Sequence, residues 1–429
     1  MRVLVRSFGC SANQADGAVL AGCLSVAGHE LVGSVLSADL VVYNTCAVKG
    51  PTEDRMIEIC RRVPEGKKLI VAGCLPLINL ERLQAEVKFD GVVGPAAGEM
   101  IVELVSGVLR GEKVMALSGC SSSMPTLALP RVQQSRVVSI VPVGYGCLGS
   151  CAYCCVVFAR GRLRSYAVRE IVERVVEDVG RGFREFWLTS QDTACYGRDV
   201  GTSLVELLRS LCRVDGDFRV RVGMMTPNMA IDILDELVEV FRDKKIFKFV
   251  HLPVQSGDDR VLRRMRRFYS ADDFKGVVDR FRARFPELTV ATDVICGFPG
   301  EGEEDFERTL RLIEEAKPDV VNVSKFFARP RTAAVEMQRD FVFPFDIKRR
   351  SGVATAVARR VGYEKNMQWV GWRGDILVDE VGKASSSWVG RNLAYKPVTV
   401  KSADNLLGKT LNVRVTDAFP TYLAGEIVK

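Results

Sequence analysis

The sequence is poor in histidine and has no long apolar run. Only two histidines, His29 and His251, occur in 429 residues, so a site for several metal ions must be built mainly from other ligands. No stretch approaches the ~20 consecutive apolar residues of a membrane-spanning helix. The opening residues, MRVLVRSFGC, form a strand pattern without the apolar segment and cleavage site of a signal peptide. We therefore expect a cytoplasmic protein with no membrane partner.

Biased composition is also absent. The chain has 47% hydrophobic and 26% charged residues, which is typical of a folded globular protein. Its length exceeds one ordinary hydrophobic core and predicts two or three domains. Sixty Lys and Arg residues against 53 Asp and Glu residues give a net charge of +7, which permits nucleic-acid binding without requiring it.

Cysteine is the chemically distinctive residue that the chain does contain. There are 13 cysteines, an odd number in a long chain, and a reducing compartment does not favour a disulfide framework. A metal or redox site is the better interpretation. Since histidine is scarce, its ligands would be mainly thiolates, which favours iron-sulfur clusters or zinc.

The first part of the chain predicts a parallel α/β domain over residues 1–115. Short apolar, β-rich runs at residues 2–8, 38–44, 68–73 and 89–94 each precede a stretch with helical periodicity. The segment around residues 118–130 is rich in Ser, Gly and Pro, as linkers are, and we place a domain boundary there.

The rest of the chain predicts two further domains. Six apolar runs between residues 137 and 326 alternate with helical patterns, which indicates a (β/α)6 partial barrel over residues 133–363. Residues 346–368 predict one long, Arg-rich helix. After it, short β-rich runs separated by Gly, Ser, Asn and Asp predict a small antiparallel β-barrel over residues 364–429. The fold class is therefore α/β with a C-terminal β-barrel.

The first cysteine constellation is a CxxxCxxC loop formed by Cys147, Cys151 and Cys154, directly after the first predicted barrel strand. Three thiolates leave one iron of a four-iron cluster free to chelate the amino and carboxylate groups of a small molecule. Barrel folds place their active sites in such loops. Cys155 is interpreted as a buried apolar residue. A zinc site or a set of reduced core cysteines is the alternative.

The second constellation consists of Cys10, Cys46 and Cys74, each of which follows one of the first three predicted strands. The carboxyl ends of parallel strands open on one sheet edge, so these cysteines are expected to converge and to hold a second three-thiolate cluster. Chance placement of core cysteines is the alternative. Residues suited to tight turns flank the three: Gly9, Asn13, Asn44 and Gly73.

The cluster loop, with Tyr153 before its third cysteine, resembles that of the radical S-adenosylmethionine (SAM) superfamily. Together with the second constellation and the segments RGRLRSYAVREIV, FWLTSQDTACYG, LPVQSGDDRVLRRMRR, TDVICGFPGEGEEDF and KFFARPRT, it resembles the methylthiotransferase family of radical SAM enzymes over essentially the whole chain. Two positions depart from the family pattern, since Gly302 stands where GFPGET usually has threonine and Arg331 where RPGT usually has glycine. The resemblance implies an N-terminal domain with an auxiliary cluster, a radical SAM partial barrel and a C-terminal TRAM domain.

The resemblance also implies the cofactors, namely two [4Fe-4S] clusters and SAM. One SAM would methylate a sulfur carried on the auxiliary cluster. A second would be reduced to a 5′-deoxyadenosyl radical that activates a substrate C–H bond, which requires an electron donor. No side chain is assigned as catalytic, because the cofactors carry the difficult chemistry.

Several polar residues are candidate SAM contacts because they follow or lie within predicted barrel strands, while the resemblance places the aromatic one near the adenine. The candidates are Tyr153, Gln191, Asp192, Gln255, Ser256 and Asp293. The alternative for the polar ones is that they cap helices or satisfy turns. His251 is expected to pack at a strand end rather than bind metal.

The expected partner is tRNA. Lys396, Lys401, Lys409 and Arg414 in the predicted barrel, with the Arg-rich helix at 346–360, would grip RNA phosphates, although a solvated charged face is the alternative. The segments GCLGSCAYC, RVGMMTPN and GRNLAYKPV resemble the archaeal and eukaryotic branch of the family. That branch converts N6-threonylcarbamoyladenosine at tRNA position 37, beside the anticodon, to its 2-methylthio derivative.

Three rival functions stay open at this point. The chain would act on tRNA isopentenyladenosine, on a ribosomal-protein aspartate, or as a non-enzymatic iron-sulfur protein that binds RNA or senses redox state. The oligomeric state is not predicted.

Overall fold

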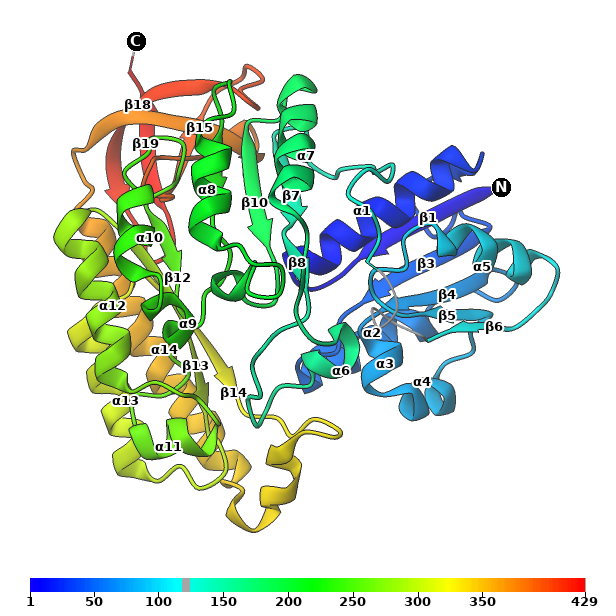
Figure 1. Ribbon diagram of the computed structural model, residues 1–429, viewed down its shortest axis with the longest axis horizontal. Helices are drawn as coiled ribbons and strands as arrows, with labels where there is room; N and C mark the ends of the chain where they lie inside the picture. Colours follow the sequence, from blue (N-terminus) through cyan, green and yellow to red (C-terminus); the bar gives the residue numbers. More distant parts are fainter. Residues whose placement is uncertain (118–123, 429) are drawn as a thin grey trace.

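The computed structural model describes residues 1–117 and 124–428, so part of the predicted linker, residues 118–123, lies outside the described residues. The N-terminal domain is a six-stranded, fully parallel sheet with the order β2-β1-β3-β4-β5-β6 (Figure 1). Four strands match the predicted runs, and two short edge strands are additional. The strands are β1 (Arg2–Ser7), β2 (Glu30–Leu31), β3 (Leu40–Thr45), β4 (Lys68–Gly73), β5 (Gly91–Val93) and β6 (Val114–Ala116).

Helices cover both faces of this sheet, which explains why its central strands are almost continuously apolar. Every residue of β3 is buried. Helices α1 and α5 pack on one face, and α2, α3 and α4 pack on the other. Their bounds are α1 (Ser11–Val26), α2 (Gly50–Arg61), α3 (Leu75–Ile78), α4 (Leu80–Glu86) and α5 (Met100–Leu109).

The central core has six parallel strands, as predicted, in two three-stranded sheets with the orders β7-β10-β11 and β12-β13-β14. Parallel bridges between Val220 and Ile246 and between Met224 and His251 join the two sheets into one open barrel wall. The strands are β7 (Val138–Pro142), β10 (Glu185–Thr189), β11 (Arg219–Arg221), β12 (Phe249–His251), β13 (Thr289–Cys296) and β14 (Val320–Lys325).

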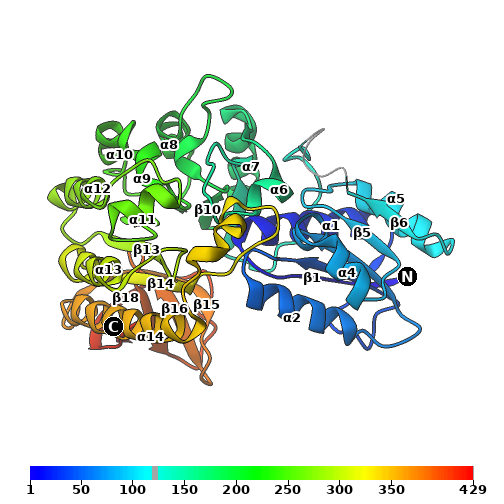
Figure 2. The ribbon, with the colours of Figure 1, turned by 90° about the horizontal axis from the view of Figure 1, so that it is seen from below.

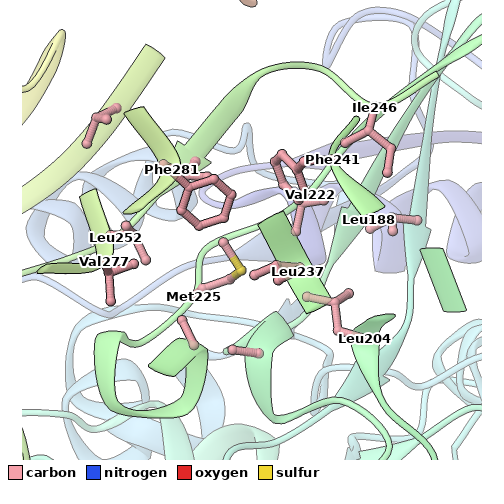
Figure 3. Packing of buried hydrophobic residues seen from close by; sticks show 14 of the residues in the cluster. Leu188, Leu204, Val222, Met225, Leu237, Phe241, Ile246, Leu252, Val277 and Phe281 are labelled. Atoms are coloured by element: carbon pink, nitrogen blue, oxygen red, sulfur yellow. The ribbon is translucent and has the colours of Figure 1, made fainter. Parts of the chain in front are cut away.

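Helices surround the outside of the barrel wall, and the core lies between the two layers. Figure 3 shows side chains from both layers meeting, with Leu188 of β10 and Val222 on the strand side and Phe241 and Phe281 on the helix side. The rings of Phe241 and Phe281 meet edge to face, with their centroids 5.2 Å apart. These helices are α7 (Val168–Gly180), α8 (Leu204–Cys212), α9 (Pro227–Ile231), α10 (Leu234–Val240), α11 (Asp259–Arg264), α12 (Ala271–Arg284), α13 (Glu303–Ala316) and α14 (Pro344–Met367). The short helix α6 (Val156–Arg160) instead packs on α3 of the N-terminal domain. Two 3-10 helices are η1 (Thr193–Cys195) and η2 (Ala333–Asp340), and a short hairpin pairs β8 (Gly144–Tyr145) with β9 (Arg164–Ser165).

The C-terminal domain is a closed five-stranded barrel with the order β15-β16-β17-β19-β18. It matches the prediction in all but one pairing, because β17 and β19 run parallel. The long helix α14, predicted over 346–368, leads into it. The strands are β15 (Arg373–Val381), β16 (Ser387–Arg391), β17 (Pro397–Lys401), β18 (Thr410–Ala418) and β19 (Leu423–Ile427).

The C-terminal barrel contacts the core at the amino ends of the core strands. Arg184, which precedes β10, donates to the Gly408 carbonyl, and Lys248 before β12 donates its backbone N–H to Leu393. In Figure 1 the β10 arrow runs away from the C-terminal barrel, and Figure 2 shows the N-terminal domain beside the core. Within the described ranges, no helix has the length and apolarity to cross a membrane.

Candidate functional site

The cluster loop of the core is fixed at both ends by the β8–β9 hairpin. Cys147, Cys151 and Cys154 are half-buried in it, with no disulfide. A Cβ at Gly149 would lie 3.2 Å from Cys147 Sγ and 3.6 Å from Cys151 Sγ, so the bare glycine backbone lies against both sulfurs. The Gly149 N–H also donates to Cys147 Sγ at 3.2 Å. The loop therefore folds around its sulfur atoms.

The electrostatics of this loop suit a positively charged metal group. Burial raises the pKa of Cys147 to about 11 and that of Cys154 to about 12, so both thiols need a compensating positive charge to ionise. One such charge is built in, because Arg267 Nη1 donates to Cys151 Sγ at 3.1 Å. Arg267 is itself held by the Tyr269 hydroxyl at 2.8 Å.

The three N-terminal cysteines lie at one edge of their sheet. Cys10 precedes α1, Cys46 directly follows β3 and Cys74 directly follows β4. Strands β1, β3 and β4 are neighbours in the sheet, so their carboxyl ends meet. A Cβ at Gly9 would lie 3.0 Å from Cys46 Sγ, and the φ of +97° at Gly9 independently favours glycine there. The structure thus brings these loops together.

Two asparagines hold the Cys10 and Cys46 loops to each other. Asn13 Nδ2 donates to the carbonyls of Phe8 at 2.6 Å and Asn44 at 3.1 Å. In return, Asn44 Nδ2 donates to the Asn13 carbonyl at 2.6 Å. These contacts bind side chains to neighbouring backbone and thereby hold the two cysteine loops together.

The N-terminal cysteines fit a cluster by their donor chemistry. Burial raises the pKa of Cys74 to about 12 and also raises the pKa of Cys46. The negative charge of neighbouring cysteine thiolates raises both pKa values further. In the described part of the chain, no three His, Cys, Asp or Glu side chains surround a point tightly enough for one metal ion. Soft thiolate donors suit an iron-sulfur cluster, and the same donors also suit zinc.

Two candidate SAM contacts follow β10 and support the cluster loop. Gln191 Oε1 accepts a hydrogen bond from the Gly146 N–H at 2.7 Å, which ties this segment to the start of the loop. Asp192 is buried and accepts from the N–H groups of Ala194 and Thr226, both at 3.1 Å. Asp192 therefore caps η1, as the alternative interpretation proposed.

Two further candidates follow β12. Gln255 has a positive φ of 73° and is held by β13, since its N–H donates to the Asp293 carbonyl at 2.8 Å. Ser256 is fully buried, and its Oγ accepts from the Asp258 N–H at 3.2 Å and lies 3.4 Å from Thr309 Oγ1. Ser256 therefore serves the packing of α11 and α13.

Tyr153 lies beside the last cysteine of the loop, on an aromatic cluster. Its ring meets Phe298 edge to face at 6.4 Å, and Phe298 meets Phe326 at 5.4 Å. The ring is thereby held on the cysteine side of the barrel.

A polar constellation at the barrel mouth was missed by sequence reasoning. His251 Nε2 lies 3.0 Å from Asp293 Oδ2, and Asn322 Nδ2 donates to Asp293 Oδ1 at 2.8 Å. Burial opposes ionisation of Asp293, but these hydrogen bonds hold its pKa below the usual value. His251 does lie at a strand end, as predicted, but it also binds this carboxylate. Asp293 was a predicted site residue, but its partners were not, because the register that pairs Asp293 with Asn322 is set by the folded sheet.

The two cysteine-bearing edges face each other, and side chains bridge them. Ser11, next to Cys10, places its Oγ 2.7 Å from Thr189 Oγ1 at the end of β10. Lys49, in the loop after Cys46, donates to Ser324 Oγ of β14 at 2.6 Å. The N-terminal domain thus covers the mouth of the partial barrel. Nothing in the sequence indicated these pairs.

The expectation that Lys396 grips RNA is wrong. Its side chain is buried, and Nζ lies 2.7 Å from both Asp319 Oδ1 and Asn366 Oδ1. It therefore fastens the C-terminal barrel to the core. Lys401 and Lys409, in contrast, are exposed.

The Arg-rich helix α14 also differs from its expected role. Three of its arginines pair with carboxylates of α13 and of the segment before it: Arg349 with Glu303, Arg350 with Glu301, and Arg360 with Glu314. These pairs hold the helix to the barrel, so the arginines that form them are not free to grip phosphates.

The unusual Arg331 occupies a backbone position that favours glycine. Its φ is +62°, which explains why a glycine is usual in this turn of the family pattern. The side chain reaches the N-terminal domain, where Nη2 donates to the Leu77 carbonyl at 2.6 Å. The guanidinium also lies 4.6 Å from the centre of the Phe158 ring.

Three family matches cover the chain in the order of its domains. Residues 2–94 match "Uncharacterized protein family UPF0004", residues 141–313 match the "Radical SAM superfamily", and residues 369–428 match the "TRAM domain".

Three relatives that align over the whole of this chain are named as threonylcarbamoyladenosine tRNA methylthiotransferases. A "Probable threonylcarbamoyladenosine tRNA methylthiotransferase" of Pyrococcus abyssi is 39% identical over 433 residues, covering 100% of each chain. The "Threonylcarbamoyladenosine tRNA methylthiotransferase" of Drosophila melanogaster is 38% identical, covering 100% of this chain and 78% of the relative. The human protein of that name is 34% identical, and the match covers 100% of this chain and 74% of the human protein.

Among solved structures, the radical SAM methyltransferase TsrM from Kitasatospora setae, with cobalamin and a [4Fe-4S] cluster bound, has a TM-score of 0.55. It is 14% identical, and the match covers 90% of this chain and 76% of that one. At that identity the likeness shows the fold alone. With full-length relatives at 34–39% identity, the chain belongs to the radical SAM methylthiotransferase family, alongside the threonylcarbamoyladenosine tRNA methylthiotransferases of archaea and animals.

Proposed function

We propose that this enzyme converts N6-threonylcarbamoyladenosine at position 37 of tRNA, beside the anticodon, to 2-methylthio-N6-threonylcarbamoyladenosine. The observation that carries this proposal is the facing of two three-cysteine edges, bridged by Ser11 and Thr189. A sulfur source and a radical source must act on one substrate carbon, so they must open on one space. The names of the full-length relatives support the nucleoside.

The cofactors of this family are SAM and two [4Fe-4S] clusters, which supply the radical and the sulfur chemistry when bound. We propose that Cys147, Cys151 and Cys154 hold one cluster and that Cys10, Cys46 and Cys74 hold the other. The open sheet edges support this assignment, as does the burial of Cys46 and Cys74 at one of them.

Among the candidate SAM contacts, Tyr153 and Asp293 are the ones we propose to touch the ligand. Tyr153 lies beside the cluster loop, and Asp293 lies at the barrel mouth with an ionised carboxylate. Gln191, Asp192, Gln255 and Ser256 would act indirectly, because their polar groups already hold the surrounding backbone.

We propose three units for this chemistry. Residues 1–115 carry the auxiliary cluster, 133–363 form the radical SAM core, and 364–429 form the TRAM domain. The TRAM domain would bind tRNA through exposed Lys401 and Lys409. A separate electron donor, either a chemical reductant or a protein, would reduce the cluster of the radical SAM core.

Nucleoside mass spectrometry tests the proposal. Anaerobically reconstituted enzyme, SAM and a chemical reductant are incubated with tRNA carrying N6-threonylcarbamoyladenosine, and the digest is expected to contain the 2-methylthio nucleoside. A Cys147→Ala variant is the matched control and should form none. An unchanged nucleoside with wild-type enzyme would sink the proposal.

The same reaction, with each possible substrate offered and its own product analysed by mass spectrometry, separates the rival functions. Conversion of isopentenyladenosine tRNA alone, or of a ribosomal-protein aspartate alone, would assign the chain to another member activity. Release of 5′-deoxyadenosine on reduction with SAM would exclude a non-enzymatic iron-sulfur protein.

A further inference from the structure

One buried arginine connects the two cysteine sites. Arg160 is the last residue of α6, the helix that begins directly after the cluster loop, and it is only 1% exposed. Its side chain crosses into the N-terminal domain, where Nη2 donates to Asp16 Oδ2 at 2.7 Å and to Asn13 Oδ1 at 3.2 Å. The core segment that carries one cysteine set therefore contributes a cation to the wall of the other.

The guanidinium has little freedom to move. Asp16 is buried and also accepts a hydrogen bond from the Tyr145 hydroxyl at 2.7 Å. The Arg160 guanidinium lies 5.8 Å from the centre of the Tyr145 ring, within the range of a cation–π contact. Contacts from α1 and from β8 thus fix it from two sides.

One end of this guanidinium is unsatisfied. Arg160 Nη1 is buried and has no hydrogen-bond partner among the described residues. Leaving a buried charged donor unpaired is costly, so such a group in a native protein calls for an acceptor. The N-terminal cysteine loops lie beside this group, because Asn13, which accepts from Arg160 Nη2, also donates to the carbonyls of Phe8 and Asn44, two residues before Cys10 and Cys46.

We propose that Arg160 is a positioning residue for the auxiliary cluster: its Nη1 donates a hydrogen bond to a sulfur of the anionic group held by Cys10, Cys46 and Cys74. This inference rests on the cluster assignment proposed above. A fixed cation with a hydrogen bond to sulfur stabilises the reduced, more negative cluster and raises its reduction potential. Because α6 also follows the loop of Cys147, Cys151 and Cys154, Arg160 would hold the auxiliary cluster at a fixed position relative to that loop.

The test measures the auxiliary cluster alone, in the full-length chain. The parent protein carries Cys147→Ala, Cys151→Ala and Cys154→Ala, is reconstituted anaerobically with iron and sulfide, and is titrated with reductant while its electron paramagnetic resonance signal is followed. Arg160→Gln is expected to lower the reduced-to-oxidised ratio at a fixed potential about tenfold, which is a midpoint ~59 mV lower for a one-electron couple. Asp16→Asn, which removes a nearby negative charge, should shift the midpoint upward.

Arg162→Gln is the matched control, because Arg162 is exposed on the same segment and should leave the midpoint unchanged. An unshifted midpoint in Arg160→Gln with normal iron content would overturn the inference. If Arg160→Gln fails to fold, Asp16→Asn decides, and an unchanged midpoint there overturns it equally. If the parent protein binds no iron, the cluster assignment and this inference are both overturned. If Arg160→Gln binds the normal amount of iron but its midpoint potential does not shift, this inference alone is overturned.

Discussion

Lys396 Nζ lies 2.7 Å from Asp319 Oδ1, with both side chains buried where the C-terminal barrel meets the core. Asp319 immediately precedes β14, so this pair fastens the barrel to the amino ends of the core strands. The cluster-loop cysteines Cys147, Cys151 and Cys154 follow β7 and lie at the opposite, carboxyl ends. An RNA that contacts both regions must therefore extend along the side of the core.

Replacing Lys396 with methionine is expected to destabilise the protein by about 3 kcal/mol, because it leaves the Asp319 carboxylate buried without its main partner. Denaturant unfolding measures this change. Lys401→Met, on the exposed side of β17, is the control and should change stability by less than about 0.5 kcal/mol. Equal effects of the two substitutions would contradict the structural role of Lys396.

The exposed lysines of the C-terminal barrel give a separate prediction for RNA binding. Lys401→Ala combined with Lys409→Ala should weaken tRNA binding and reduce the slope of log K against log salt by about 1.4 to 1.8, since two phosphate contacts are lost. Filter binding over a range of salt concentrations measures the slope. A folded Lys396→Met protein should keep the wild-type slope, and a loss of slope there would return Lys396 to the RNA surface.

Arg331 offers a test of backbone strain against side-chain contact. Arg331→Ala loses the contacts with Leu77 and Phe158 but keeps the positive φ, whereas Arg331→Gly loses the contacts and relieves the strain. The glycine variant should therefore be more stable than the alanine variant by about 1 kcal/mol. Chemical denaturation of the pair measures the difference, and equal stability would show that the turn relaxes.

Glu185 should make the contact between core and C-terminal barrel sensitive to pH. It is fully buried at the start of β10, and its Oε1 accepts from Trp187 Nε1 at 2.5 Å and Tyr395 OH at 3.1 Å. Burial, with the nearby Asp379 carboxylate, raises the pKa of Glu185 to about 7. The native state thus holds a proton that the unfolded state releases above about pH 4.3. Its contribution to stability is fully present below that pH and is lost as the pH rises through about 7.

Glu185→Gln keeps the neutral shape and removes the titration. The melting temperature of this variant relative to wild type should therefore increase between pH 5 and pH 8, as followed by circular dichroism. Glu65→Gln, at an exposed position, should show a constant difference. A constant difference for Glu185→Gln as well would mean that the buried carboxyl is charged throughout.

Iron and sulfide analysis tests the two cysteine sets directly. Cys46→Ala and Cys147→Ala should each lose about one cluster, or about four iron atoms per chain. Cys155→Ala is the matched control: Cys155 is adjacent to Cys154, yet it is 1% exposed and packs with the hydrophobic core of the N-terminal domain, so both clusters should remain. Full iron content in Cys46→Ala would remove the auxiliary site.

Local sequence patterns were sufficient to predict the three-part fold. Apolar periodicity and turn residues act over a few neighbouring positions, so the core strands and helix α14 could be placed within a few residues. The cysteine edges followed as well, because parallel strands put all their carboxyl ends on one side and spacing along the chain then becomes proximity in space.

Contacts between distant segments were decided only by the tertiary structure. Residue type does not tell whether a cation is solvated or buried, so Lys396 looked like a phosphate contact and proved to be half of a buried ion pair. Arg160 was not singled out from the sequence, yet its side chain reaches Asp16 and Asn13 of another domain. Domain packing determines such pairings, because it depends on the fit of whole surfaces, whereas the strands and cysteine loops were determined by the sequence alone through local periodicity and spacing.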